Sequence, residues 1–427
     1  MAIVTVAASV GNFLDYFEWF VSASASALVW PAVFFPHATP AIALLSSIFA
    51  LVLGFLLRPV GAFIFGHVGD RRGRKTTLVW TLVLMGIGTL GIALTPGYAA
   101  IGIYAIVLLF VFRLIQGIGI GGEFGGAATW VTEVAEKSKW RTFFASWINA
   151  TSNGGNFAAA IAFAALIASM PSSDFLNYGW RIPFYIGFVI ALVGFVIRYK
   201  TMESPIFQQL RQQIQQKRAT ARAPAVVLLT KHWRQLLIVA GMHLVNGAGT
   251  YTFIFATGFI QPAYGVSRGV AAFGATLGTL ASVIAVIIGG LLANPIGRKR
   301  LIFISQTLVL IIAVPVFGLL FKTADTILIY IAFILLGTMQ NIAFAIYPSY
   351  YPEQFPTAVR YSGSGLGYQL GSTIGASAAP LIASSLFVIY GNAAGASIGL
   401  MLMVFSFISM LATLMSKELP KGSSLQF

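Results

Sequence analysis

Hydrophobic stretches long enough to cross a lipid bilayer recur along almost the whole chain. A helix needs about 20 mostly apolar residues to cross roughly 30 Å of hydrocarbon, whereas a membrane β-barrel would show alternating segments of about 10 residues. The stretches found here are of the first kind. They predict an all-α, polytopic membrane protein with twelve transmembrane helices, near 7–30, 42–66, 77–95, 99–132, 142–169, 180–199, 233–262, 268–293, 301–321, 326–351, 358–389 and 393–416.

The composition excludes several other classes of protein. Of 427 residues, 58% are hydrophobic and only 9% are charged, whereas about a quarter of a typical soluble chain is charged. The chain has no cysteine, so it can form neither a disulfide framework nor a thiolate metal site. Its four histidines lie far apart in the sequence, unlike the short spacings of metal-binding histidines. We therefore expect no metal and no cofactor.

The distribution of basic residues predicts the orientation in the membrane. With a cytoplasmic N-terminus, 21 of the 26 Lys and Arg residues fall on the cytoplasmic side and three on the opposite side. Such an excess marks the cytoplasmic side, so we expect a multi-pass protein of the cell membrane with both termini in the cytoplasm. This asymmetry accounts for the net charge of +15 without a nucleic-acid partner. The opening sequence MAIVTVAASVGNFLDY has no basic segment, which favours a first transmembrane helix over a cleaved signal peptide.

A repeated motif indicates that the chain consists of two similar halves. GHVGDRRGRK at 66–75 and GLLANPIGRK at 290–299 align at a constant offset of 224 residues. The glycines permit a tight turn between helices, and the carboxylate of Asp70 can accept hydrogen bonds from the N-terminus of a neighbouring helix. The second copy has Asn294 in place of Asp70. The motif therefore predicts a charged latch in the first half only.

The only long polar connection divides the expected spans into six and six. It contains SPIFQQLRQQIQQKRATARAP, whose glutamines and basic residues are typical of an interfacial or cytoplasmic linker. A binding site for a regulatory partner is the alternative for this segment. We expect two pseudo-symmetric six-helix bundles, at 1–199 and at 233–427 with a short cytoplasmic tail, joined by a linker at 200–232.

Six segments spread over most of the chain are distinctive. They are GNFLDYFEWF at 11–20, LLRPVGAFIFGHVGDRRGRK at 56–75, RLIQGIGIGGEFGGAATWVTEVA at 113–135, WRIPF at 180–184, ESPIF at 203–207 and FPTAVRYSGSGLGYQLG at 355–371. Together they resemble the major facilitator superfamily, whose second loop reads G-x-x-x-D-R-x-G-R-[RK], and more narrowly the metabolite:proton symporter family. The resemblance implies proton-coupled transport of di- and tricarboxylates, aromatic carboxylic acids, or zwitterions such as betaine and proline.

Charged residues inside the expected spans are the first functional candidates, because each costs about 2.5–3.5 kcal/mol to insert. Asp15 and Glu18 are three residues apart and share one face of the first helix. Arg58, on the second span, is expected at a similar depth near the midplane. Two carboxylates beside an arginine can bind and release a proton. We therefore expect a proton-coupling site here, with a static ion pair between the first two helices as the alternative.

The fourth span carries two more intramembrane charges. Arg113 precedes Glu123 by ten residues, which is roughly 15 Å along a helix, so the two cannot pair directly. Similarity to the superfamily motif R-x-x-Q-G-x-G implies a part for Arg113 in proton coupling, and Glu123 is a further candidate. The guanidinium groups of Arg58 and Arg113 could also bind a substrate carboxylate. The glycines at 117–122 are expected to allow close helix packing rather than phosphate binding.

A gate is expected where the loops of the first half meet the cytoplasm. Asp70, Arg71 and Arg74 belong to the repeated motif, and Glu133 lies near the cytoplasmic end of the fourth span. Glu133 could pair with Arg71 and close this gate. A solvated loop acid is an equally good interpretation of Glu133.

Polar residues within other spans are candidates to line a substrate cavity. On the fifth span Asn149, Asn153 and Asn156 recur at helical spacing, and they either line the cavity or form interhelical hydrogen bonds. The spans of the second half hold almost no charge, so proton coupling is expected mainly in the first half, and His243 is either structural or a proton relay. The expected substrate-binding residues are Arg58, Arg113, Trp147, Asn149, Asn153, His243, Asn341 and Gln369.

Three other classes of membrane protein fit the sequence less well. GDRRGRKT at 69–76 lacks the P-loop spacing that a primary pump would need, and an enzyme would gather its reactive groups at one interface. A channel does not require pseudo-twofold halves with polar groups at the midplane, as alternating access does. We therefore expect a monomeric proton-coupled symporter of a small organic metabolite, above all a carboxylate, and not an enzyme; its partners are the substrate, protons and the lipid bilayer. Proton-linked sugar uptake or drug efflux on the same fold is the alternative.

Overall fold

The computed structural model describes residues 2–136, 138–204, 206–209, 212 and 224–419. These residues form helices and connecting turns, with no strand among them. Ten of their helical stretches are long and apolar enough to cross a membrane, and the last, 357–415, contains two helices. The first helix, 27 residues long, is additional to these ten. This arrangement confirms the prediction of an all-α protein with twelve spans.

The first half of the chain supplies six long membrane helices, the second of which is broken. Short helices join them at the ends of the bundle. The elements are α1 (Ala2–Leu28), α2 (Trp30–Phe34), α3 (Pro40–Leu56), α4 (Arg58–Arg72), α5 (Arg74–Leu94), α6 (Tyr98–Ile101), α7 (Ile103–Val134), α8 (Arg141–Ser169), α9 (Ser172–Asn177), η1 (Gly179–Arg181) and α10 (Ile182–Lys200).

The second half of the chain also supplies six long helices, and its second helix is continuous. Its elements are α13 (Trp233–Tyr264), α14 (Arg268–Ile296), α15 (Arg298–Pro315), η2 (Val316–Leu320), η3 (Phe321–Thr323), α16 (Thr326–Phe344), α17 (Tyr347–Tyr350), η4 (Pro352–Gln354), η5 (Thr357–Val359), α18 (Arg360–Tyr390), η6 (Gly391–Ala393) and α19 (Ala394–Met415).

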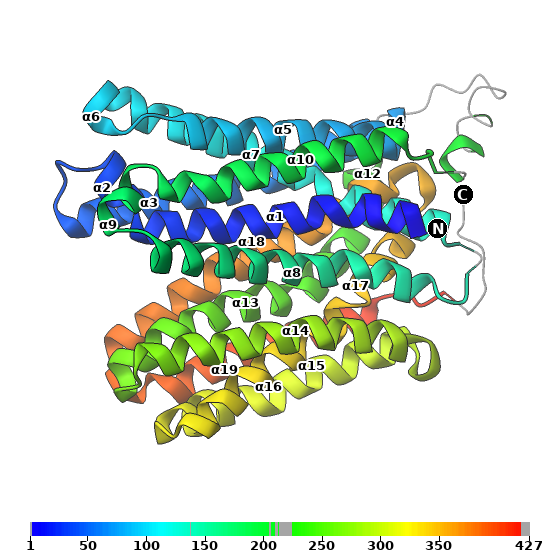
Figure 1. Ribbon diagram of the computed structural model, residues 1–427. Coiled ribbons are helices and arrows are strands. Elements are labelled where there is room, and N and C mark those ends of the chain that lie inside the picture. The colour runs from blue at the N-terminus through cyan, green and yellow to red at the C-terminus, as the bar shows by residue number, and fades with distance from the viewer. Residues whose placement is uncertain (1, 137, 205, 210–211, 213–223, 420–427) are drawn as a thin grey trace.

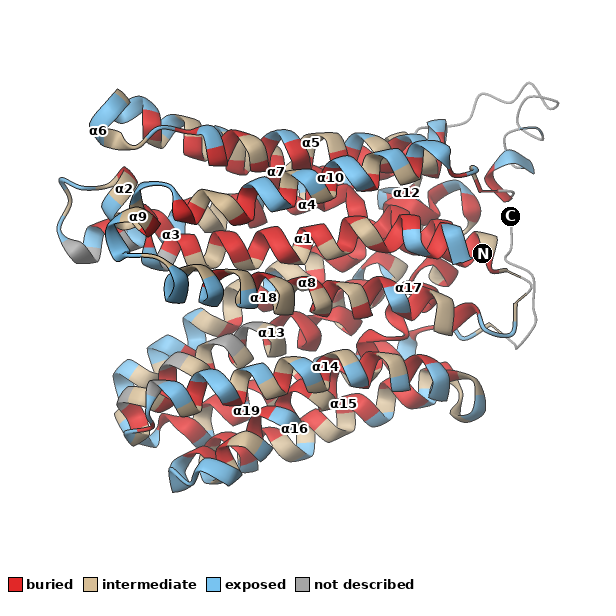
Figure 2. Cartoon of the chain, in the orientation of Figure 1, coloured by how far each residue is buried: buried red, intermediate tan, exposed pale blue. Residues whose placement is uncertain are grey.

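Figure 1 shows the helices of the two halves as two groups, one above the other, with their axes roughly parallel. Helices α4, α7 and α8 of the first half contact α14, α17 and α18 of the second. Helix α1 begins and α19 ends at the same end of the bundle, which we call the terminal side; α2, α6 and α9 lie at the opposite end. Many large apolar residues are exposed, as expected for contact with lipid, and Figure 2 shows exposed residues along the outer helices of the bundle.

Both copies of the repeated motif form the same sharp turn. Gly73 ends α4 with φ 121° and ψ 151°, and Gly297 ends α14 with φ 99° and ψ 137°. Residues with a side chain rarely adopt these positive φ values. The expected tight reversal between helices is therefore confirmed in both halves.

Close packing of α4 and α7 depends on glycine. A Cβ atom on Gly61 would lie 2.1 Å from the carbonyl oxygen of Ile118, and one on Gly121 would lie 2.1 Å from that of Arg58. Such approaches leave no room for a side chain, so the expected packing role of the α7 glycines is confirmed. This contact brings the backbone of α7 against the start of α4, where Arg58 lies.

Part of the predicted linker is a helix packed against both halves. Helix α12 (Pro224–Lys231) contacts α4 of the first half and α13 and α18 of the second. Leu228 of α12 is fully buried in the apolar cluster between them. Residues 205, 210–211 and 213–223 of the predicted linker lie outside the described residues.

Candidate functional site

A small cavity of about 30 Å³ lies between the two halves of the chain. Helices α1, α3 and α4 supply its wall on one side, and α13 and α18 supply it on the other. Because both halves contribute, a molecule bound here would contact both. The lining residues are Asp15, Tyr16, Trp19, Phe55, Arg58, His243, Asn246, Gly247, Thr250 and Ser372.

Asp15 and Arg58 form an ion pair in the wall of this cavity. Nη2 of Arg58 lies 3.0 Å from Oδ1 of Asp15, and both residues are buried. The guanidinium group also lies 4.2 Å from the ring centre of Phe55, in cation–π contact. Pro59 has no N–H group and disfavours helical geometry at the preceding residue, so the helix breaks at Leu57 and Arg58 begins α4. The break thus positions a cation in mid-span.

The opposite wall of the cavity is polar but uncharged. His243 lies 3.4 Å from the hydroxyl of Tyr351 through Nδ1 and 4.2 Å from the ring centre of Tyr368. The Tyr368 hydroxyl is 3.0 Å from that of Tyr16 across the two halves. The buried amide nitrogen of Asn246 has no hydrogen-bond partner among the described residues. This wall can therefore donate hydrogen bonds to a ligand.

Glu18 and Arg113 are joined through one intervening amide. Nε2 of Gln116 donates to Glu18 at 2.7 Å, while Oε1 of Gln116 accepts from Arg113. Thr89 also donates to Glu18. Neither Glu18 nor Arg113 is among the described residues that line the cavity. Glu18 therefore points into the core of the first half, although it shares a helix face with Asp15.

Arg113 also contacts two other helices of the first half. Its Nη1 lies 3.0 Å from the hydroxyl of Ser22, and its Nη2 lies 3.1 Å from the carbonyl oxygen of Leu51. The sequence predicted Arg113 both for proton coupling and for substrate binding. Arg113 does not line the cavity in the described residues, and its link to Glu18 through Gln116 is the contact that bears on proton coupling. Gln116 was not singled out from the sequence, although it is the glutamine of the R-x-x-Q-G-x-G motif and lies one helical turn from Arg113.

Three other predicted substrate residues form hydrogen bonds between the two halves, and a fourth, Gln369, is buried. Nδ2 of Asn149 donates to the carbonyl oxygen of Phe344 at 2.6 Å, and Nδ2 of Asn153 donates to Asn341 at 3.1 Å. These asparagines therefore form interhelical hydrogen bonds, one of the two roles considered for the stripe. Gln369 is buried, and its amide has no partner among the described residues.

Trp147, which the sequence predicted for substrate binding, does not line the central cavity. Trp147 is 38% exposed and lines an apolar groove on the outer surface between α1, α8 and α10. The helix period explains this placement, because Trp147 lies two residues before Asn149 and so on a different face of α8.

Glu123 belongs to a separate ion pair toward the terminal side. Its carboxylate pairs with the guanidinium of Arg198 on α10 and accepts a hydrogen bond from Thr81 at 2.8 Å. Arg198 also donates to the carbonyl oxygens of Ala7 and Leu78, both at 2.8 Å. Both charged groups are fully buried. From the sequence Arg198 counted only as a loop cation, because its partner lies 75 residues away.

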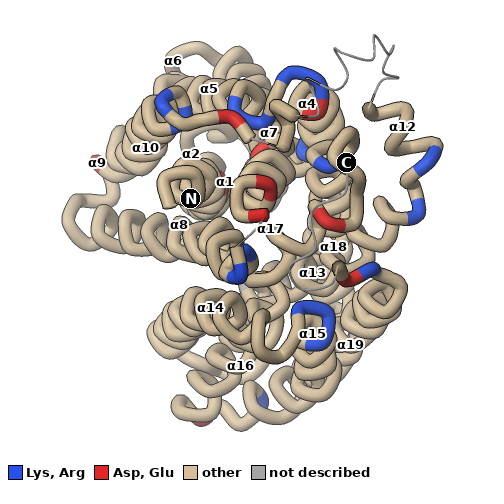
Figure 3. Tube along the Cα trace, turned by 90° about the vertical axis from the view of Figure 1, so that its right-hand side faces the viewer, with Lys and Arg blue, Asp and Glu red and all other residues tan. Residues whose placement is uncertain are grey.

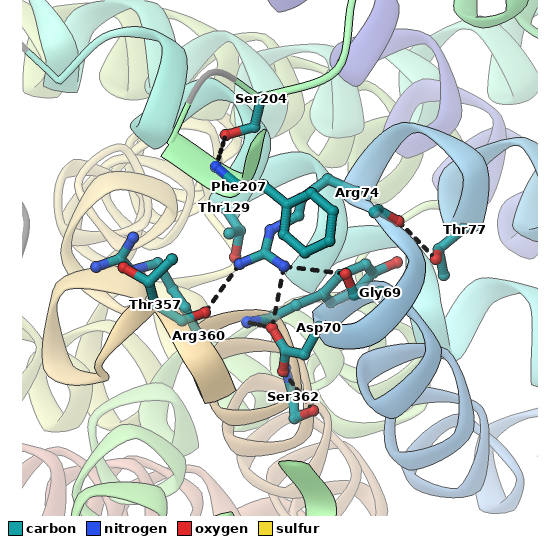
Figure 4. Close-up of polar contacts among 12 residues, drawn as sticks. Gly69, Asp70, Arg74, Thr77, Thr129, Ser204, Phe207, Thr357, Arg360 and Ser362 are labelled. Atoms are coloured by element: carbon teal, nitrogen blue, oxygen red, sulfur yellow. Dashed lines mark hydrogen bonds and ion pairs between the residues drawn. The ribbon is translucent and has the colours of Figure 1, made fainter. Parts of the chain in front are cut away.

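Asp70 binds the N-terminus of α18 in the opposite half. Its carboxylate accepts from the backbone N–H groups of Tyr361 at 3.1 Å and Ser362 at 2.9 Å, and from the Ser362 hydroxyl at 2.7 Å. Figure 4 shows this contact beside Arg74. Negative charge at a helix N-terminus is favourable. The predicted contact between this carboxylate and a helix N-terminus is confirmed.

Glu133 bridges the two halves, but not through Arg71. It lies 3.1 Å from Arg74 and 3.0 Å from Arg360, and Arg74 also donates to the carbonyl oxygen of Thr357 at 3.0 Å (Figure 4). The predicted Glu133–Arg71 pair is wrong, because Arg71 is exposed whereas Arg74 at the start of α5 points inward. Glu133 is buried, so it is not a solvated loop acid.

A second charged cluster occupies the equivalent place in the other half. Glu353 pairs with Arg298, which is 224 residues after Arg74, and with Arg141 at the start of α8 at 2.8 Å. The cluster thus joins a same-half arginine and an opposite-half arginine, as Glu133 does. The expectation of a charged latch in the first half only is wrong. The carboxylate comes from η4, outside the repeated motif, so comparing the motif copies did not reveal it.

The described hydrogen bonds and ion pairs that join the halves lie near the cavity or on its terminal side. Figure 3, viewed from the terminal side, shows acidic and basic residues gathered at the helix ends on that side. The terminal side is therefore closed. The pairs are Tyr16–Tyr368, Asp70–Tyr361, Asp70–Ser362, Arg74–Thr357, Gly122–Tyr361, Thr129–Ser364, Thr132–Pro348, Glu133–Arg360, Lys139–Asn294, Arg141–Glu353, Thr142–Ser349, Asn149–Phe344 and Asn153–Asn341.

Known proteins similar to this chain are membrane transporters. The inner membrane metabolite transport protein YhjE of Escherichia coli K12 is 35% identical over 421 residues, covering 97% of this chain and 94% of that protein. The shikimate transporter of the same organism is 32% identical, with 96% and 92% covered. The proline/betaine transporter of Salmonella typhimurium is 31% identical, with 89% and 76% covered.

Comparison of folds agrees with the sequence relatives. The proton:xylose symporter XylE bound to 6-bromo-6-deoxy-D-glucose has a TM-score of 0.78 at 17% identity, with 99% of this chain and 97% of that chain covered. A family model described as Major Facilitator Superfamily matches residues 8–380. The chain is therefore a multi-pass membrane transporter of metabolites, not an enzyme, and belongs to the major facilitator superfamily.

Proposed function

We propose that this protein is a proton-coupled symporter of a small organic carboxylate and works by alternating access. The observation that carries the proposal is the 3.0 Å ion pair between Asp15 and Arg58 in the wall of the cavity. Arg58 is the cation that a substrate carboxylate would meet there. Ionised Asp15 already pairs with Arg58 and so competes with a substrate carboxylate. Protonation of Asp15 would remove this competition.

Protonation of Asp15 would link proton binding to substrate binding. When Asp15 is ionised, it competes with a substrate carboxylate for the guanidinium group of Arg58. When Asp15 is neutral, Arg58 can bind the substrate in a bidentate manner. Each ligand then raises the affinity of the other, since such coupling is reciprocal. The proton and the anion therefore bind and leave together, as symport requires.

A zwitterion is the second candidate substrate, and the composition of the cavity wall favours it. Asp15 beside Arg58 offers both charges, and Tyr16, Trp19 and Phe55 surround them with aromatic rings. Aromatic faces attract ammonium groups. The relatives named for shikimate and for proline and betaine support a carboxylate and a zwitterion respectively. Sugar uptake and drug efflux remain alternatives on the same fold.

The terminal side would be the cytoplasmic gate. The excess of Lys and Arg in its loops supports a cytoplasmic location for both termini in the cell membrane. Asp70 and the clusters around Glu133 and Glu353 join the halves there. Breaking these contacts would let the halves, 1–199 and 233–427, rock about the cavity. Glu18, Arg113 and Glu123 stay secondary candidates for proton coupling, and we expect the transporter to act as a monomer.

A ligand screen followed by a transport assay tests the proposal. Purified protein is first screened by thermal shift with shikimate, glycine betaine, proline and xylose, because a ligand that binds the folded state raises Tm. The ligand found is then offered to liposomes that carry the protein. We expect an inward proton gradient to drive accumulation of a carboxylate or zwitterion. Accumulation of xylose alone, or uptake that a proton gradient does not change, would contradict the proposal.

A further inference from the structure

A large pocket lies on the outer surface at the terminal side, away from the small central cavity. It has a volume of about 620 Å³ and lies between α5 and α10. None of its residues lines the central cavity. The lining residues are Arg72, Lys75, Thr76, Val79, Trp80, Val83, Phe195, Tyr199, Glu203, Phe207 and Gln208.

This α5–α10 pocket is polar at one end and apolar at the other. Arg72 and Lys75 lie where α4 ends and α5 begins. Val83 lies eight residues beyond Lys75, which is roughly 12 Å deeper along the helix. Trp80 is 56% exposed and Tyr199 is 67% exposed, as aromatic residues at a membrane interface often are. We therefore expect the polar end at the membrane boundary and the apolar end within the hydrocarbon.

The positive charge at the rim of the pocket is available to a ligand. No carboxylate among the described residues pairs with the side chain of Arg72 or Lys75. The one acid in the lining, Glu203, is already used, because it accepts from the backbone N–H groups of Arg74 and Lys75 at 3.1 Å and from that of Ser204 at 2.9 Å. The rim thus presents two cations and one hydrogen-bonded carboxylate, a net positive charge, above an apolar floor.

We propose that the α5–α10 pocket binds an anionic phospholipid. The headgroup phosphate contacts Arg72 and Lys75, and an acyl chain lies along Val79, Trp80 and Val83. Basic residues at a membrane surface attract anionic lipids, and the apolar floor continues into the hydrocarbon where an acyl chain already lies. The site is separate from the transport cavity, so the proposal does not depend on the identity of the substrate.

The groove around Trp147 provides a comparison within the same molecule. Its volume is about 610 Å³, and its lining contains no charged residue. An acyl chain alone can occupy such a groove, with no preference for the headgroup. Of these two surface pockets, we therefore expect the α5–α10 pocket, and not the Trp147 groove, to prefer an anionic headgroup.

Native mass spectrometry of the full-length protein tests the proposal with dioleoyl phosphatidylglycerol and dioleoyl phosphatidylcholine as probes. We expect the wild type to bind phosphatidylglycerol more tightly than phosphatidylcholine. Arg72→Gln with Lys75→Gln should lower the phosphatidylglycerol affinity by about tenfold to thirtyfold, at about fivefold per surface cation. The matched control is Arg234→Gln with Arg300→Gln, which removes two exposed cations from the same side and should have no such effect. Equal loss in both double variants, or equal binding of the two lipids by the wild type, would overturn the proposal.

Quenching of Trp80 fluorescence locates the lipid without altering the basic residues. The chain has eight tryptophans, so the signal of Trp80 is taken as the difference between the wild type and Trp80→Phe. Phosphatidylglycerol brominated on its acyl chains should quench this component at lower concentration than brominated phosphatidylcholine does. Quenching of Trp80 to the same extent by both lipids at all concentrations would show an unselective lipid contact and contradict the proposal.

Discussion

The carboxylate of Asp15 on α1 and the guanidinium of Arg58 on α4 lie 3.0 Å apart in the wall of the cavity between the two halves. A buried ion pair of this kind contributes little net stability, because both groups lose their hydration. Its position in the cavity therefore favours a role in ligand binding over a purely structural one. The predictions below begin with this pair.

Replacing Arg58 should separate substrate ligation from simple charge balance. Arg58→Lys keeps the charge but loses the planar fork that fits a carboxylate, so substrate affinity should fall. Arg58→Gln should weaken binding further, because the cost of breaking a buried pair is about 3–5 kcal/mol. Affinity measured by titration calorimetry at several pH values checks this. A mere shift of the pH profile, with full affinity at its optimum, would rule out direct contact with the carboxylate.

Asp70→Asn should loosen the terminal side. The amide loses the charge that stabilises the N-terminus of α18, and its NH2 group cannot accept from Tyr361 or Ser362. Because the chain has no cysteine, Ser364→Cys can report opening through labelling by a maleimide. Ser364 is buried at the interface of the halves, 3.2 Å from Thr129. We expect faster labelling in Asp70→Asn than in the parent.

The control for this latch is Arg71→Gln in the same Ser364→Cys background. Arg71 belongs to the same motif but is exposed, so its removal should leave the labelling rate unchanged. Equal labelling rates for Asp70→Asn and the parent would remove Asp70 from the gate.

Glu353→Gln should open the same side through the second cluster. The change leaves Arg141 and Arg298 facing each other without the carboxylate between them. Faster labelling of Ser364→Cys is expected, and the effects of Glu353→Gln and Glu133→Gln on the opening free energy should add if the two clusters act independently. An unchanged rate in Glu353→Gln would confine the gate to the first cluster.

Glu123→Gln tests whether the pair with Arg198 is structural. The substitution leaves a fully buried guanidinium without a counter-charge, which costs about 3–5 kcal/mol. We expect a clearly lower Tm in thermal unfolding of the purified protein. Adding Arg198→Met should restore part of the loss, since the unpaired charge is gone. A variant with normal Tm that has lost proton-driven uptake would instead make Glu123 a proton-coupling residue.

The fold could be predicted from the sequence because its signals are local. Each apolar stretch is long enough to define a span by itself, and the glycines of the repeat define the turns at Gly73 and Gly297. Depth along a helix could also be estimated, which is why Asp15 and Arg58 were expected at a common level. They meet because Arg58 begins α4 directly after α3, and α3 packs against α1.

The partners of several charged residues could not be predicted, because they depend on packing between distant segments. Arg198 lies at the end of a span, and only the folded chain brings it to Glu123. Arg360 lies in the distinctive segment 355–371 and Glu353 lies just before it, yet neither position indicated a partner in the other half. Closeness in sequence can also mislead. Trp147 lies close in sequence to the asparagine stripe but faces outward.

The pH dependence of substrate affinity tests the central claim most directly. The ligand from the thermal-shift screen is titrated against the wild type, Asp15→Asn and Glu18→Gln between pH 5 and pH 8. If a proton on Asp15 releases Arg58, affinity in the wild type rises as the pH falls, Asp15→Asn binds with a high affinity that no longer depends on pH, and Glu18→Gln keeps the wild-type dependence. An Asp15→Asn variant that retains the wild-type pH dependence would contradict the account, and loss of that dependence in Glu18→Gln alone would place the coupled proton on Glu18.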